Sequence, residues 1–204
     1  MSGQLSLTGE APHHTPRDER GRCVRDGFFT PDTLAMTIVA RATGDFGAHG
    51  PALEPSAGGG AFVRAMAQEP SIGHVTAVDL EPATDLRAAG AGTVHVGDFL
   101  DYHPERAFRL IAGNPPFRDA QRHVEHALSL LVNRGALVFL LRLAFLESLS
   151  RVEFWRRHHA SLRYVDVMHK RPSFTGGGTD SCAYGVFSFQ NGYDGPTEQR
   201  FLEW

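Results

Sequence analysis

The sequence lacks the residues that hold small secreted domains or metal centres together. Its 204 residues include two cysteines, Cys23 and Cys182, which lie far apart and without metal-ligand spacing. We therefore expect reduced thiols in a cytoplasmic protein and no bound metal. No apolar run approaches the length of a membrane span, and the first residues lack the apolar core of a signal peptide. The sequence thus predicts a soluble protein that does not enter a membrane.

Lysine is nearly absent as well, since Lys170 is the only one in the chain. The formal net charge of −3 argues against a broad surface for nucleic acids, although a local basic patch is compatible with it. With 42% hydrophobic and 21% charged residues, the chain has the composition of an ordinary globular domain. We expect one domain over residues 26–204, preceded by a mobile polar tail over residues 1–25.

The glycine-rich segment over residues 54–60 does not fit the two common nucleotide loops. No Gly-Lys-Ser/Thr follows it, which excludes a phosphate-binding P-loop, and it does not match Gly-x-Gly-x-x-Gly. Its consecutive glycines still allow a ligand to approach the backbone closely, directly before a predicted helix. The segment is therefore a candidate ligand-binding turn of another kind.

Short apolar runs alternate with helical segments along the chain. Strands are predicted over residues 51–54, 75–78, 93–96, 109–113, 136–141, 162–168 and 183–189. Helices are predicted from Pro31, with Thr30 as N-cap, and over residues 61–68, 83–89, 119–131 and 147–159. This alternation predicts a single α/β domain with a mostly parallel seven-stranded sheet and helices on both faces. The last two strands are joined without a clear helix, which indicates an antiparallel edge strand.

Polar residues follow the first four predicted strands. Glu54, Asp79 and Asp98 come at the ends of three strands, and Asn114-Pro115-Pro116-Phe117 follows the fourth. In open α/β sheets, ligands bind at the carboxyl ends of the strands near the switch point of the strand order. A turn or a helix cap explains each acid taken singly. All four strand ends together predict one ligand site.

The tetrapeptide that begins at Asn114 has its own chemistry. Its two prolines fix φ and donate no N–H group, so the turn is stiff and its carbonyls can accept hydrogen bonds. A planar substrate with an –NH₂ group could stack on Phe117 and donate to the Asn114 side-chain oxygen and the Pro115 carbonyl. The alternative is a proline turn with Phe117 as a core aromatic. The tetrapeptide by itself does not decide between the two.

Taken together, these segments resemble class I S-adenosylmethionine-dependent methyltransferases, and more narrowly the DNA adenine-N6 type. The resemblance spans residues 28–189 and includes Phe28-Phe29-Thr30-Pro31, which resembles the aromatic-Thr-Pro segment that caps the methionine end of the cofactor. It implies a Rossmann-like fold, S-adenosylmethionine as cofactor and methyl transfer to an exocyclic amino nitrogen. The implied catalytic residues are Asn114, Pro115, Pro116 and Phe117. The implied cofactor-binding residues are Phe29, Thr30, Pro31, Glu54, Pro55, Ser56, Ala57, Gly58, Gly60, Asp79, Leu80, Asp98, Phe99 and Asn114.

The expected substrate is adenine in DNA, flipped out of the duplex and stacked on Phe117. Phe174, in the glycine-rich loop over residues 170–180, is a candidate second wall, and Lys170 and Arg171 are candidates for phosphate contacts. A hairpin connection with solvated charges is the alternative for this loop. We expect no separate target-recognition domain within these 204 residues, so specificity is expected to be loose, short or supplied by a partner chain.

Three other substrates or roles remain compatible with the sequence. The same chemistry could act on tRNA or rRNA bases, or on the side-chain amide of a protein glutamine. A non-catalytic, cofactor-binding partner subunit is a third alternative. The aromatic-Thr-Pro segment favours the DNA type, and the complete Asn-Pro-Pro-Phe motif argues against a non-catalytic role.

Overall fold

The computed structural model describes residues 29–47, 49–174 and 182–204. The predicted tail, residues 1–25, and residues 175–180 of the predicted substrate loop lie outside these ranges. The strands are β1 (Gly50–Glu54), β2 (Ile72–Asp79), β3 (Thr93–Val96), β4 (Phe108–Gly113), β5 (Leu131–Arg142), β6 (Leu162–Met168), β7 (Tyr184–Gln190) and β8 (Glu198–Leu202). The α-helices are α1 (Asp32–Phe46), α2 (Ala61–Gln68), α3 (Ala120–Ser129) and α4 (Val152–His158). Short 3-10 helices span Phe99–Asp101, Phe117–Asp119, Leu143–Leu146, Leu149–Arg151 and His159–Ser161.

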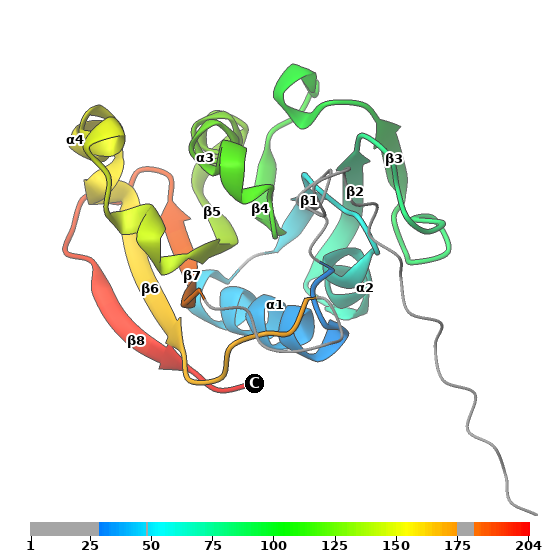
Figure 1. Ribbon diagram of the computed structural model, residues 1–204. Helices are drawn as coiled ribbons and strands as arrows, with labels where there is room; N and C mark the ends of the chain where they lie inside the picture. The colour runs from blue at the N-terminus through cyan, green and yellow to red at the C-terminus, as the bar shows by residue number, and fades with distance from the viewer. Residues whose placement is uncertain (1–28, 48, 175–181) are drawn as a thin grey trace, which may run out of the picture.

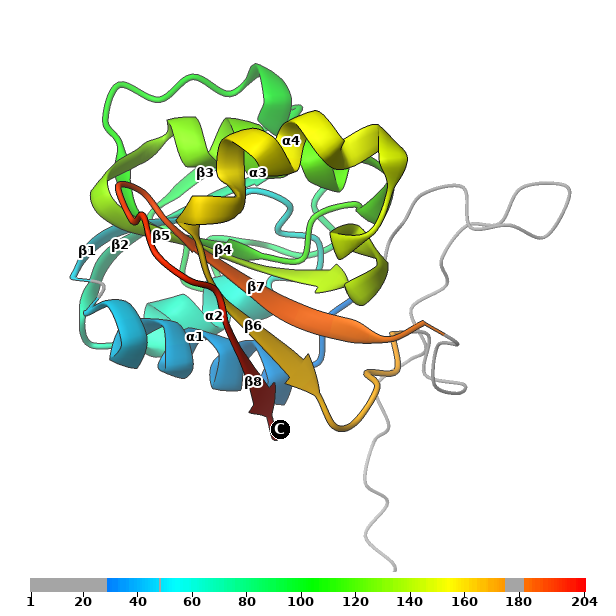
Figure 2. The ribbon, with the colours of Figure 1, turned by 90° about the vertical axis from the view of Figure 1, so that its left-hand side faces the viewer.

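The strands form one sheet, which lies between two layers of helices (Figures 1 and 2). Its order over the described residues is β3-β2-β1-β4-β5-β7-β6-β8. Leu34 of α1 and Met66 of α2 belong to one buried apolar cluster, while Val124 of α3 and Phe154 of α4 belong to another. Because both faces of the sheet are covered, β5 is buried along most of its length. The predicted fold class, a mostly parallel sheet between helices, is confirmed.

Two details of the sheet differ from the prediction. The antiparallel strand β7 does not lie at an edge, because it pairs with β5 on one side and β6 on the other. Beyond β6 lies β8, an eighth strand that runs parallel to β6 and is not among the seven predicted strands. Only Leu202 of β8 is fully buried, so no apolar run marks this strand in the sequence.

Two local predictions also need correction. The predicted helix over residues 83–89 is a series of turns, because Asp85 Oδ1 accepts hydrogen bonds from the N–H groups of Arg87 and Ala88. Such side-chain bonds compete with helical ones. Helix α1 begins at Asp32, one residue later than predicted, because Pro31 has an extended ψ of 139°. No side chain caps this helix.

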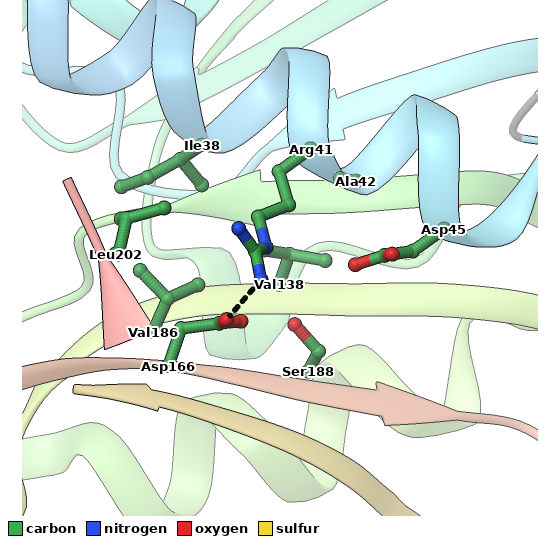
Figure 3. Close-up of a pocket in the computed structure, with 9 residues that line it drawn as sticks. All are labelled: Ile38, Arg41, Ala42, Asp45, Val138, Asp166, Val186, Ser188 and Leu202. Atoms are coloured by element: carbon green, nitrogen blue, oxygen red, sulfur yellow. Dashed lines mark ion pairs between the residues drawn. The ribbon is translucent and has the colours of Figure 1, made fainter. Parts of the chain in front are cut away.

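A network of ion pairs ties α1 to the far end of the sheet. Arg200 of β8 donates to both carboxylate oxygens of Asp166, at 2.9 and 2.8 Å, and to both of Asp45, at 3.1 and 2.7 Å. Arg41 adds a second cation 3.0 Å from Asp166, as Figure 3 shows. The cavity beside these groups has a volume of about 10 Å³, which is room for no more than a water molecule. We therefore interpret the network as structural.

Candidate functional site

A cavity of about 560 Å³ lies where β1 and β4 end. These neighbouring strands form the centre of the parallel part of the sheet, where ligands bind in open α/β folds. The volume is within the usual range for a small-molecule site. Eight of the predicted cofactor-binding residues line it: Phe29, Thr30, Pro31, Glu54, Ser56, Ala57, Gly58 and Asn114. The structure thus brings the aromatic-Thr-Pro segment, the glycine turn and the first residue of the tetrapeptide to one cavity.

The glycine turn is shaped by two close contacts. The N–H of Gly58, a residue with φ of +46°, donates to Asp79 Oδ2 at 2.7 Å. A Cβ on Gly59 would lie 2.9 Å from the ring of Phe29, so a side chain at this position would displace the ring. The aromatic-Thr-Pro segment and the turn are therefore packed directly against each other. Asp79 holds the turn through its hydrogen bond with Gly58.

Glu54, at the end of β1, is a buried acid in the lining of the cavity. It is 2% exposed, and its Oε1 accepts a hydrogen bond from the Ser56 N–H at 3.0 Å. Burial raises the pKa of the Glu54 carboxyl well above its ordinary value of 4.5. The Ser56 N–H opposes this shift, and the negative charge of Asp79 adds to it. Since Glu54 forms no ion pair with another described residue, the cavity favours a ligand that places a positive charge beside it.

Two predicted acids lie at strand ends but do not belong to the described lining of the cavity. Asp79 also accepts from the Glu81 N–H, through Oδ1 at 2.8 Å. Asp98 accepts from the Leu100 N–H at 2.9 Å and so caps the 3-10 helix that follows β3. Their predicted contacts with a ribose and an adenine stay predictions.

The remaining predicted cofactor residues differ strongly in exposure. Pro55 and Gly60 are buried, and Gly60 has a φ of +79° at the start of α2. Leu80 is 65% exposed, which leaves an apolar side chain beside the predicted ribose site. Phe99 is buried, with its ring centroid 5.4 and 4.8 Å from those of His123 and His126. Phe99 therefore follows the end of β3 in the chain, and its ring packs in the core.

The aromatic residues predicted to hold a substrate form one cluster. Phe117 has its ring centroid 5.5 Å from that of Tyr184 and 6.5 Å from that of Phe174. The guanidinium of Arg142, the last residue of β5, lies 4.7 Å from the Phe117 centroid. Phe117 is half-buried, whereas Phe174 is buried. The two predicted walls, Phe117 and Phe174, are thus neighbours.

Lys170 and Arg171 are exposed at the start of the predicted substrate loop. The Lys170 ammonium lies 4.8 Å from the centroid of the Trp204 ring, and the Trp204 indole N–H donates to the Lys170 carbonyl at 3.1 Å. Two residues after Arg171, Ser173 lines the cavity. The loop therefore begins beside the cavity, and its role in binding a substrate stays a prediction.

Six lining residues lie outside the segments predicted to bind a ligand. They are Asp32, Ala61, Phe62, Arg64, Ala83 and Thr84. Gly59 and Ser173 also line the cavity, and they lie within the predicted glycine turn and the predicted substrate loop. One signal was available for Arg64, since it follows Gly60 by four residues and so faces the glycine turn from one helical turn along α2. Its partner Asp32 is 32 residues away, and no local pattern indicates that pairing.

The described residues provide neither a metal site nor a helix that could span a membrane. No group of three or more histidine, cysteine, aspartate or glutamate residues in this part of the chain is placed to hold a metal ion. Within the same ranges, every helix is too short or too polar to cross a membrane.

Part of the chain is similar in sequence to a known enzyme. Over 104 residues it is 36% identical to the type II methyltransferase M.TthHB8I of Thermus thermophilus. The match covers 48% of this chain and 23% of that enzyme, so the chain spans about a quarter of the relative's length. No protein-family profile matches the chain.

Solved structures share the fold at low sequence identity. A candidate class I S-adenosylmethionine-dependent methyltransferase of Listeria monocytogenes has a TM-score of 0.64 at 12% identity, over 87% of this chain and 66% of that one. The M protein of the type I restriction enzyme EcoKI has a TM-score of 0.62 at 16% identity, over 83% of this chain and 45% of that one. A candidate RNA methyltransferase of Pyrococcus horikoshii has a TM-score of 0.61 at 15% identity, over 80% of this chain and 87% of that one. The chain therefore has the fold of class I S-adenosylmethionine-dependent methyltransferases.

Proposed function

We propose that this chain, with its class I methyltransferase fold, transfers a methyl group from S-adenosylmethionine to N6 of adenine in DNA. One observation carries the proposal. Asn114, the first residue of the Asn-Pro-Pro-Phe motif, lines the same cavity as the glycine turn and Phe29-Thr30-Pro31. The proposed donor site and the proposed acceptor motif therefore share one cavity.

The chemistry of the cavity fits the proposed cofactor. When bound, S-adenosylmethionine supplies an electrophilic methyl group on a positively charged sulfur, and its amino-acid end carries an ammonium group. Burial favours the neutral form of Glu54, which has no ion pair among the described residues, and a positive group of the cofactor beside it would favour the ionised form. Gly58 and Gly59 present bare backbone to a ligand. Asp79 is the proposed ribose acceptor and Asp98 the proposed adenine acceptor, each at a strand end.

The acceptor side of the site activates a weak nucleophile. The amino nitrogen of adenine has its lone pair delocalised into the ring. Hydrogen bonds from this amino group to the Asn114 side-chain oxygen and the Pro115 carbonyl favour a more localised lone pair. The two prolines hold both acceptors rigidly, so much of the rate comes from positioning. The ring of Phe117 offers a stacking face for the extruded base.

DNA is the proposed polymer, and the support for it comes from relatives. About half of this chain is 36% identical to a type II methyltransferase, and the chain shares its fold with the M protein of the type I restriction enzyme EcoKI. The similar fold of the Pyrococcus protein makes RNA the second candidate. We propose that sequence recognition is short, loose or supplied by a partner chain.

Labelled methyl transfer tests the proposal. The purified chain is incubated with S-adenosylmethionine and with unmethylated DNA, RNA or protein, and the products are identified by mass spectrometry. We expect N6-methyladenine in DNA. Methyl groups found only in RNA or on glutamine would show that RNA or protein, and not DNA, is the substrate. If the chain binds the cofactor but transfers no methyl group, it would be better explained as a non-catalytic partner subunit.

Asn114→Ala is the control for this assay. The substitution removes the group that would accept from the substrate –NH₂, so transfer should fall below detection. Because Asn114 is also a predicted cofactor-binding residue, cofactor affinity should fall too, but by far less than transfer. Equal losses of cofactor binding and transfer would mean that Asn114 acts through the donor site alone.

A further inference from the structure

Arg64 is the cationic side chain in the described lining of the cavity. It projects from the first turn of α2, directly after the glycine turn. Its Nη1 donates to the Gly59 carbonyl at 2.9 Å, and its Nε and Nη2 donate to Asp32 Oδ1 at 3.2 and 2.6 Å. The guanidinium is therefore held at the cavity by the glycine turn on one side and by the start of α1 on the other.

These contacts leave part of the guanidinium available to a ligand. A guanidinium has five N–H donors, and Arg64 uses three of them in the bonds just described. Each terminal nitrogen keeps one donor, which is the arrangement that binds a carboxylate through both of its oxygens. Arg200 of the same chain already holds two carboxylates at once, those of Asp166 and Asp45. An arginine paired with Asp32 can thus accept a second anion.

Glu54 and Arg64, two oppositely chargeable side chains of the cavity, differ in burial. Glu54 is buried at the end of β1, where its carboxylate packs against Gly113, the residue before Asn114. Arg64 lies at the more open side, with 36% of its side chain exposed. A ligand with a positive group near the acceptor motif and a negative group toward solvent matches this order.

We propose that Arg64 recognises the carboxylate at the amino-acid end of the cofactor, while Glu54 offsets its positive groups. This inference rests on the proposed function and adds a binding residue to it. Asp32 and the Gly59 carbonyl act as positioning groups, since they fix the plane of the guanidinium before the ligand arrives. The pair of opposite charges selects a zwitterionic amino-acid end and fixes its direction in the cavity.

Calorimetric binding of two compounds tests this role. S-adenosylmethionine and its decarboxylated form differ only in the carboxylate that Arg64 would bind. We expect Arg64→Gln to weaken S-adenosylmethionine binding about tenfold and to leave the decarboxylated compound within about twofold of the wild type. Arg64→Lys keeps the charge but loses the planar fork, so its affinity for S-adenosylmethionine should lie between those of the wild type and Arg64→Gln.

Arg156→Gln serves as the matched control, because Arg156 is an exposed arginine of α4 paired with Glu153. It should leave both affinities unchanged. Equal weakening of both compounds by Arg64→Gln would overturn the inference, because it would mean that Arg64 only supports the fold of the cavity. No weakening of either compound would overturn it too. A wild-type chain that binds neither compound would refute the proposed function itself. This outcome is seen in the wild type, whereas failure of the role of Arg64 is seen only when the variants are compared with it.

Discussion

The carboxylate of Glu54 fills the space that a side chain at Gly113 would need. A Cβ built on Gly113 would lie 2.8 Å from Cδ of Glu54 and close to both carboxylate oxygens. Glu54 ends β1 and Gly113 ends the neighbouring β4, so the contact joins the cofactor side of the cavity to the acceptor motif that begins one residue later. The acid and the glycine therefore depend on each other.

Gly113→Ala should consequently damage both stability and cofactor binding. The added methyl group must displace the Glu54 carboxylate or the end of β4, and overpacking of this kind costs about 2 kcal/mol. Urea unfolding measures the first effect and calorimetry with S-adenosylmethionine the second. Gly44→Ala in α1 is the control, because a Cβ there has nothing within 4 Å and should stabilise the helix slightly. If Gly113→Ala behaves like Gly44→Ala, the space is not needed by Glu54.

Glu54→Gln should make the ligand-free protein more stable at neutral and alkaline pH. The pKa of Glu54 is raised by burial, so the neutral carboxyl stabilises the fold fully below the unfolded pKa. This contribution is lost as the pH rises through the raised pKa of the folded state. The temperature of thermal unfolding, measured across a pH series, should therefore fall less steeply toward alkaline pH in the variant than in the wild type.

The same substitution should weaken cofactor binding, because glutamine cannot offset the positive charge of the ligand. Calorimetry at neutral pH measures this effect. A variant that is more stable but binds the cofactor as tightly as the wild type would show that Glu54 does not serve the ligand.

Phe117→Ala should impair the use of DNA without impairing cofactor binding. Loss of stacking on one base costs about 1–3 kcal/mol, so kcat/KM for DNA should fall about 10- to 100-fold. Phe117→Trp keeps an aromatic face and should retain most of the activity. Equal losses in the two variants would instead indicate that the packing of Phe117 with Tyr184 and Phe174 is what matters.

Arg200→Leu should destabilise the chain by about 3 kcal/mol, because it removes a cation from buried Asp166 and from Asp45. Chemical denaturation measures the loss. Arg156→Ala is the control, since its pair with Glu153 is exposed and should contribute less than about 0.5 kcal/mol. Comparable values for the two variants would contradict the structural role of the network.

The sequence was sufficient for features that depend on neighbouring residues. Helix α2 and strand β3 have the predicted limits, because an apolar pattern between glycine and polar residues marks each of them. Placing Glu54 and Asn114 at one cavity required only one rule, that parallel strands bring their carboxyl ends to the same edge of a sheet. Strand β8 was missed because its one fully buried residue leaves no pattern.

By itself, then, the sequence determined the parallel α/β fold, the strand ends that carry the chemistry and the Asn-Pro-Pro-Phe motif. Only the tertiary structure decided that Arg64 pairs with Asp32 in the lining of the cavity, that Glu54 occupies the space beside Gly113, and that β7 lies inside the sheet. The physical reason is the same in each case. These contacts join residues far apart along the chain, and they exist only after the strands and helices have packed together.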